Sequence, residues 1–205
     1  LKVYNYMTTG LLITGLVAYF FGKASIVTNE SGQLIGITPI GNMLFNSPLQ
    51  WVVILAPLAM MFYFTFRFRH MSLAAAQTTF WIFATLMGLS LASLFIVYTG
   101  ASITRVFFIC SATFGAMSIY GYTTKRDLTA LGGFLMMGVI GLIIANIVNF
   151  FLQSPALYYG VSFIGVLIFV GLTAYDTQKI KNMYYEGDSE NTSGKKAVYG
   201  ALQLY

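Results

Sequence analysis

The chain has 205 residues, of which 58% are hydrophobic, 17% aromatic and only 8% charged, and its formal net charge is +5. This composition excludes an ordinary soluble domain and predicts an integral membrane protein. The apolar runs are long and do not alternate with polar residues, so they indicate spanning helices rather than the strands of a membrane barrel. We therefore expect an all-α, polytopic membrane helical bundle that forms a single domain over residues 1–205.

Six apolar segments approach or exceed the roughly 20 residues that a spanning helix needs. They cover residues 4–22, 51–66, 73–98, 103–122, 131–152 and 157–180. The third would be about 39 Å long as one helix, so it should tilt or protrude. A seventh span starts near residue 195 and is truncated at Tyr205, and the chain begins at Leu1 rather than at a methionine. We therefore expect further chain before and after these residues.

The longest polar connection covers residues 23–50. Its segment TNESG predicts a turn, and Pro39 and Pro48 disfavour helix. We expect an external loop here. In the second span, Pro57 is tolerated because the residue lies in a membrane helix, where it predicts a kink.

Lysine and arginine residues are distributed unevenly among the connections. With a cytoplasmic N-terminus, only Lys23 and Arg105 of the 11 basic residues lie outside, and Arg105 reaches the external interface. This bias predicts a cytoplasmic N-terminus. It also accounts for the net positive charge, so we expect no binding of nucleic acid.

The sequence contains little that resembles a catalytic or cofactor site. His70 is the one histidine, Cys110 lies in an apolar run that favours a buried, inert thiol, and no glycine-rich phosphate loop occurs. Any metal would have to be held by oxygen atoms. Because no nucleophile stands with a base and an orienting acid, we predict that the protein is not an enzyme and has no cofactor.

Asp176 is the residue that most needs an explanation. It lies in the sixth predicted span, and an ionisable group within a span costs a few kcal/mol unless it is compensated. One reading places it at the cytoplasmic interface, weakly paired with Lys179 or Lys181. The other makes it a functional site with Arg67, or alternatively Arg69, as its counter-ion. The absence of a helix breaker before Gly187 favours the second reading, because the helix then continues past the carboxylate.

Other polar and small residues in the spans predict packing. We expect Gln77, Asn146 and Asn149 to form hydrogen bonds between helices rather than to bind ions. Pairs of small residues four apart should allow helices to approach closely. These pairs are Gly88 with Ala92, Ser111 with Gly115, and Gly141 with Ala145.

Three segments that occur in order resemble one known family. They are GLSLASLFIVYTGASITRVFF, SIYGYTTKRDLTALGGFLMMGVIGLIIANIVN and GLTAYDTQKIKNMY. The chain is similar to the bacterial branch of the Bax-inhibitor family, the transmembrane Bax inhibitor motif proteins. The resemblance implies a multi-pass protein of the bacterial inner membrane, with six helices around a central seventh, and a pH-sensitive leak of calcium.

The resemblance also implies roles for particular residues. Asp176 matches an aspartate that pairs with a second aspartate on the seventh helix, which would follow Tyr205, and Arg67 matches an associated arginine. Two adjacent carboxylates away from water share one proton, and losing that proton frees oxygen atoms that suit calcium. Protons, calcium and membrane lipid are the expected partners. The alternative is an interaction protein that modulates a membrane protease or a stress response without conducting ions.

Overall fold

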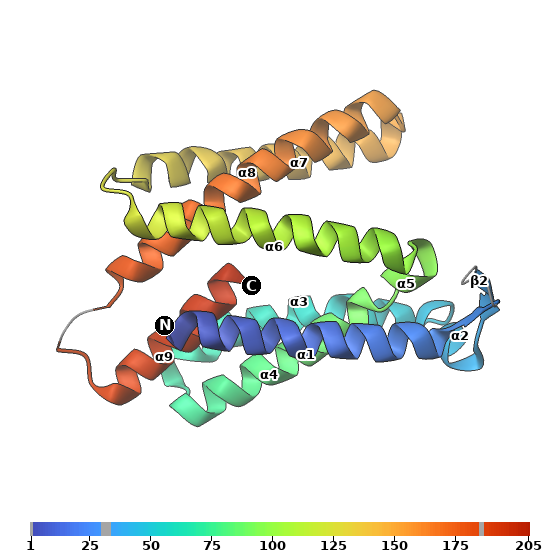
Figure 1. Cartoon of the computed structure of the whole chain (residues 1–205), viewed down its shortest axis with the longest axis horizontal. Coiled ribbons are helices and arrows are strands. Elements are labelled where there is room, and N and C mark those ends of the chain that lie inside the picture. Colours follow the sequence, from blue (N-terminus) through green and yellow to red (C-terminus); the bar gives the residue numbers. More distant parts are fainter. Residues whose placement is uncertain (1, 30–33, 185–186) are drawn as a thin grey trace. The chain divides into compact units, whose positions relative to one another are not determined.

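The computed structural model describes residues 2–29, 34–184 and 187–205. Six helical stretches in this part of the chain are long and apolar enough to span a membrane, which confirms the predicted all-α membrane fold (Figure 1). They are formed by α1 (Lys2–Ser25), α3 (Leu49–Arg67) with η1 (Phe68–His70), α4 (Leu73–Leu91) with α5 (Leu94–Val97), α6 (Gly100–Thr123), α7 (Thr129–Leu152) and α8 (Pro155–Asn182). The remaining elements are β1 (Ile26–Thr28), β2 (Leu34–Ile37), α2 (Pro39–Phe45) and α9 (Glu190–Leu204).

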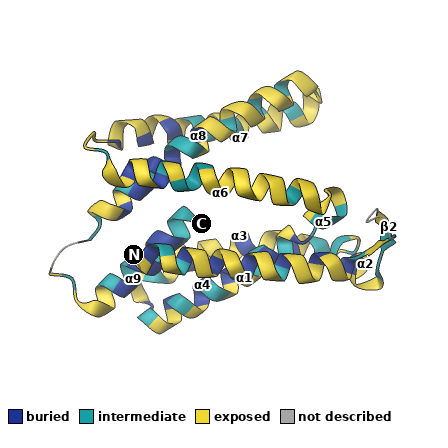
Figure 2. Ribbon diagram, in the orientation of Figure 1, coloured by how far each residue is buried: buried dark blue, intermediate teal, exposed yellow. Residues whose placement is uncertain are grey.

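The chain divides into two compact units. The first contains the elements up to the start of α6, together with α9, and the second contains the rest of α6 with α7 and α8. The single domain over residues 1–205, the cytoplasmic N-terminus and the continuation of α9 into a seventh span stay predictions. Much of the surface of α6, α7 and α8 is exposed and apolar, as expected of helices that face lipid (Figure 2).

In the first unit, α1 and α4 pack closely because small residues line their contact. The buried residues of α1 recur every three or four positions and so form one face of the helix. A methyl group at Gly88 of α4 would lie 2.7 Å from the Thr14 carbonyl oxygen, so the two backbones nearly touch. Thr14 also donates from Oγ1 to the Ala84 carbonyl at 2.6 Å. Gly88 and Ala92 are buried, which confirms the packing role predicted for this pair.

Helix α9 packs on α4 and η1 within the same unit. The ring of Tyr205 lies edge-on to those of Phe80 and Phe83, at centroid distances of 6.0 and 5.3 Å. The Tyr205 hydroxyl forms a hydrogen bond with Thr14 Oγ1. Near the start of α4, Tyr199 packs on Phe68 at 5.1 Å. The helix begins at Glu190, five residues before the predicted start of a seventh span, because Ser189 caps it by accepting from Thr192 N.

The connection between the first two spans is more regular than predicted. Strands β1 and β2 pair antiparallel, with Ile26 opposite Ile37, and α2 follows. The expectation that Pro39 disfavours helix was wrong, because it occupies the first turn of α2, where proline needs no N–H, and Thr38 caps that turn. Pro48 immediately precedes α3 and does not interrupt it. Part of the predicted TNESG turn lies outside the described residues.

The third predicted span, residues 73–98, is not one helix. Helix α4 ends at Leu91 and α5 starts at Leu94. Ser93 lies in the break and donates from Oγ to the Ser90 carbonyl at 2.9 Å, a local bond that competes with regular helix geometry. Pro57 is buried inside the continuous α3, and the kink predicted there stays a prediction.

In the second unit, α7 and α8 form a helical hairpin. Gln153 ends α7 in the left-handed conformation, at φ 49°, and Ser154 and Pro155 then start α8. Leu135, Ile168 and Leu172 form the core between these helices. The turn and this core hold α8 antiparallel to α7, and Asp176 lies near the far end of α8.

Candidate functional site

Asp176 lies in the last third of α8, and the helix continues for six residues beyond it. This confirms the prediction that the helix does not end at the carboxylate. Asp176 is about 32 Å along the axis from Pro155, which is close to the roughly 30 Å thickness of a hydrocarbon core. This length fits the predicted position of Asp176 at the edge of the hydrocarbon core, which stays a prediction. The residue is half-buried.

Two glycines of neighbouring helices hold the turn of α8 that precedes Asp176. A methyl group at Gly121 of α6 would lie 2.9 Å from Ala174 Cα, and nearer still to the Ala174 carbonyl oxygen. One at Gly132 of α7 would lie 2.7 Å from the Tyr175 Cγ atom. Both α6 and α7 therefore pack directly on the two residues before Asp176, and only glycine leaves the space for that approach.

The turn after Asp176 is joined to the connections of the same unit by two side chains. The amide of Gln178 bridges the loop between α6 and α7: Oε1 accepts from Leu128 N at 2.9 Å, and Nε2 donates to the Arg126 carbonyl at 2.8 Å. Lys181 Nζ donates to the Tyr122 carbonyl at 2.7 Å, in the last turn of α6. Such a cation compensates the negative end of that helix. We call Gln178 and Lys181 the α8 clamp.

Weak pairing of Asp176 with Lys179 or Lys181, the simpler interpretation from the sequence, stays a prediction. Lys181 donates to a backbone carbonyl, and Lys179 Nζ lies 5.9 Å from the centroid of the Tyr175 ring. Each of the two amines thus has another partner. Arg67 is exposed at the end of α3 in the first unit, with Arg69 in η1, so the pairing of either arginine with Asp176 stays a prediction.

Asp127 is the other described carboxylate in this unit, and it has a structural role. Its Oδ1 accepts from Thr129 Oγ1 at 2.6 Å and from Thr129 N at 2.9 Å, at the start of α7. These two hydrogen bonds, the side-chain one first, hold the pKa of Asp127 below its usual value of 3.8. Asp127 thus stabilises a helix start and remains charged at neutral pH.

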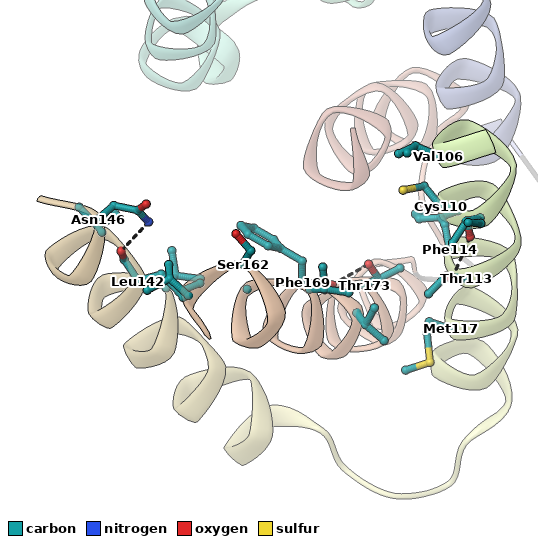
Figure 3. A pocket seen from close by; sticks show the side chains of 17 residues that line it. Val106, Cys110, Thr113, Phe114, Met117, Leu142, Asn146, Ser162, Phe169 and Thr173 are labelled. Atoms are coloured by element: carbon teal, nitrogen blue, oxygen red, sulfur yellow. Dashed lines mark hydrogen bonds between the residues drawn. The ribbon is translucent and has the colours of Figure 1, made fainter. Parts of the chain in front are cut away.

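An apolar groove of about 780 Å³ lies between α6, α7 and α8 (Figure 3). Polar side chains on its wall are turned back on their own helices. Asn146 donates to the Leu142 carbonyl at 2.8 Å, and Thr173 donates to the Phe169 carbonyl at 2.9 Å. Calcium requires six to eight oxygen ligands, and this wall supplies mainly hydrocarbon. The groove is thus suited to apolar contacts rather than to an ion.

All 205 residues match the profile of the family described as inhibitor of apoptosis-promoting Bax1. The chain belongs to the Bax inhibitor family. It is 47% identical over 205 residues to a protein of Rickettsia prowazekii, covering 100% of this chain and 81% of that relative. It is also 42% identical over 207 residues to inner membrane protein YbhL of Escherichia coli strain K12, covering 100% of this chain and 83% of YbhL. The family resemblance inferred from the sequence is confirmed.

This member of the Bax inhibitor family is a multi-pass protein of the inner membrane. Six helices able to span a membrane and the inner-membrane relative support that location, as expected from the sequence. Among the residues that the structure describes, no group of three or more histidine, cysteine, aspartate or glutamate side chains is arranged to hold a metal ion.

Several other sequence predictions for this family member have clear outcomes. Gln77 of α4 donates to the Tyr6 hydroxyl of α1, which confirms its role between helices. Asn146 instead bonds within α7, and Asn149 accepts from Ser154 N at 3.0 Å in the turn, so neither joins two spans as predicted. Both bonds are local because the acceptor or donor lies only four or five residues away. Cys110 was predicted to be buried and is exposed on the groove wall.

The helices of the second unit do not approach one another most closely at the predicted small-residue pairs. A methyl group at Gly115 or Gly141 would meet no described atom within 4 Å. The close approaches use Gly121 and Gly132, described above, and Gly138, where a methyl would lie 2.7 Å from Ile168 Cδ1. Spacing alone did not identify them, because which face of a helix meets a neighbour depends on the whole bundle.

Proposed function

We propose that this protein is a pH-sensitive, calcium-permeable leak of the inner membrane, in which Asp176 is the titrating group and Arg67 its counter-ion. One observation carries the proposal. The chain has six acidic residues, and Asp176 is the one that falls within the six helical spans of the described structure. A carboxylate retained in a span, where it is costly, is expected to bind or transfer a cation or a proton.

The chemistry of the proposed gate follows from charge. A carboxylate at the edge of the hydrocarbon attracts a proton, a cation or an internal guanidinium, and these compete for the same oxygens. Arg67 would hold the site closed to calcium while the two residues are paired. The family resemblance adds a second aspartate on the seventh helix, and such a pair would share one proton and titrate as a unit. No catalytic step is part of this proposal.

The test is calcium flux into liposomes that carry the full-length protein, measured across pH 5 to 8. Wild type should conduct in a pH-dependent manner, and Asp176→Asn should remove the pH dependence, because the amide cannot titrate. Asp127→Asn is the matched control, since it makes the same substitution in a loop of the same unit and should leave the flux profile unchanged. Arg67→Gln should shift the pH midpoint of flux without abolishing conduction.

Two results would overturn the proposal. Flux no greater than that of empty liposomes at every pH would favour the alternative, an interaction protein that modulates a membrane protease or a stress response. A pH dependence that survives in Asp176→Asn and is lost in Asp127→Asn would place the titrating group elsewhere.

A further inference from the structure

A pocket of about 380 Å³ is built entirely from residues of the first unit, where α1, α4 and α9 begin. Helix α9 lies beside the N-terminal end of α1 (Figure 1). The rim includes Lys2, Leu73 and Glu190, each the first described residue of its helix. Tyr6 and Trp81 contribute to the wall. Residues far apart in the sequence are thus brought to one site.

The pocket is held in shape by packing. Gln77 Nε2 donates to the Tyr6 hydroxyl, and the Tyr6 and Trp81 ring centroids are 5.9 Å apart. On the opposite side, a methyl group at Gly194 of α9 would lie 2.9 Å from Leu73 Cδ2, so α9 packs directly on the start of α4. The contacts of Tyr6 hold the aromatic wall, and the packing of Gly194 on Leu73 holds the start of α9, which carries Glu190, beside the same helix α4.

The rim carries one positive and one negative side chain that do not pair with each other. Among the residues that the structure describes, neither the Lys2 amine nor the Glu190 carboxylate has a hydrogen-bond or ion-pair partner. Farther along α9, by contrast, Lys196 forms an ion pair with Asp188 at 2.6 Å. Two separated, opposite charges on one rim complement a ligand that itself carries both charges.

The pocket is lined by charged residues at the helix starts and by aromatic residues farther along the helices. The charges lie at the helix starts, whereas Tyr6 lies about 6 Å along α1 from Lys2 and Trp81 about 12 Å along α4 from Leu73. Tyrosine and tryptophan are enriched where the headgroups of a bilayer meet its hydrocarbon. The pocket thus follows the order of a phospholipid, from charged headgroup inward to glycerol.

We propose that this pocket binds the headgroup of a phospholipid that carries both a phosphate and a primary ammonium, of the phosphatidylethanolamine class. Lys2 binds the phosphate, and Glu190 accepts hydrogen bonds from the ammonium, while the aromatic rings of Tyr6 and Trp81 lie deeper beside the glycerol. A headgroup with a phosphate alone is repelled by Glu190. A trimethylated ammonium has no N–H to donate to the carboxylate.

The chain supplies its own reporter for this site. It has two tryptophans, Trp51 and Trp81, and Trp51 is exposed at the other end of a span, in the first turn of α3. In a Trp51→Phe background, Trp81 emission is recorded in detergent while short-chain phosphatidylethanolamine is added to the delipidated full-length protein. We expect a saturable change, with at least tenfold weaker binding of phosphatidylcholine and phosphatidylglycerol.

Variants of the rim test the assigned contacts without disturbing the wall. Glu190→Gln and Lys2→Gln should each weaken phosphatidylethanolamine binding about tenfold, because each removes one charged contact. Both residues are exposed, so neither change should unfold the protein. Asp127→Asn and Lys125→Gln remove the same charges from a loop of the second unit and should not alter binding.

Three outcomes would contradict the proposal. Equal responses to the three lipids would show non-specific partitioning, and unchanged affinity in both rim variants would remove the assigned contacts. Saturation by free phosphoethanolamine at the same concentration as by the lipid would identify a site for a soluble zwitterion instead.

Discussion

The contact between Gly121 and Ala174 gives the sharpest prediction for stability. In Gly121→Ala, the new methyl group would lie 2.9 Å from Ala174 Cα and closer to its carbonyl oxygen, whereas ordinary contacts begin at 3.4 Å. The obstacle is backbone, which cannot rotate away, so α6 and α8 must move apart by at least about half an ångström. Such overpacking costs about 1–3 kcal/mol, which outweighs the gain of up to about 1 kcal/mol that alanine brings to a helix interior.

The matched control is Gly115→Ala, in the same helix. A methyl group at Gly115 would meet no described atom within 4 Å, so only the gain in helix propensity remains. Unfolding by increasing the fraction of SDS in mixed micelles should rank Gly115→Ala at or above wild type and Gly121→Ala about 1–2 kcal/mol below it. Equal stability of the two variants would refute the assigned contact between α6 and α8.

The remaining predictions concern the other close contacts and the loop of the second unit. Gly88→Ala should destabilise the protein by about 1–2 kcal/mol in the same assay, because the methyl group meets the backbone of α1, whereas Gly15→Ala meets no described atom and should be neutral or stabilising. Gln178→Ala should cost about 1–2 kcal/mol and accelerate hydrogen exchange at the start of α7, since two hydrogen bonds to the loop are lost. Because folding lowers the pKa of Asp127, its carboxylate contributes stability above pH 3.8 that is lost as the pH falls through the folded value. Thr129→Val should raise that pKa towards 3.8, as measured by carbon NMR titration of the carboxyl group.

Most of the fold was predictable because it depends on local sequence. Apolar length identified all six spans, and the absence of a breaker after Asp176 correctly predicted that α8 continues beyond that residue. The predicted helix boundaries were wrong at two places where a polar side chain bonds to the nearby backbone. The third span is interrupted between Leu91 and Leu94, where Ser93 bonds to the Ser90 carbonyl, and Thr38 with Pro39 starts a helix in the connection predicted as a loop. Both effects depend on single hydrogen-bonding positions that hydropathy does not detect.

The surroundings of Asp176 were less predictable because they are made by distant segments. Gln178 looks like any polar residue at the end of a span, yet it bridges a loop some fifty residues earlier in the chain. The signal that could have found it is its place two residues after Asp176, where a neutral amide lies between charged side chains. The glycines that meet α8 were missed because α6 and α7 each contain several glycines, and only the three-dimensional packing selects among them.

Two variants can separate the effect of the Asp176 charge from the effect of the structure that surrounds it. Ala174 and Tyr175 are packed against glycines of α6 and α7, and Gln178 joins the next turn to the loop. The backbone at Asp176 is therefore held by neighbours on both sides. Asp176→Asn removes the charge and leaves that support, whereas Gln178→Ala removes support and leaves the charge. If proton binding at Asp176 controls flux, the first variant should lose pH dependence at near-normal stability, and the second should keep a titration while losing stability.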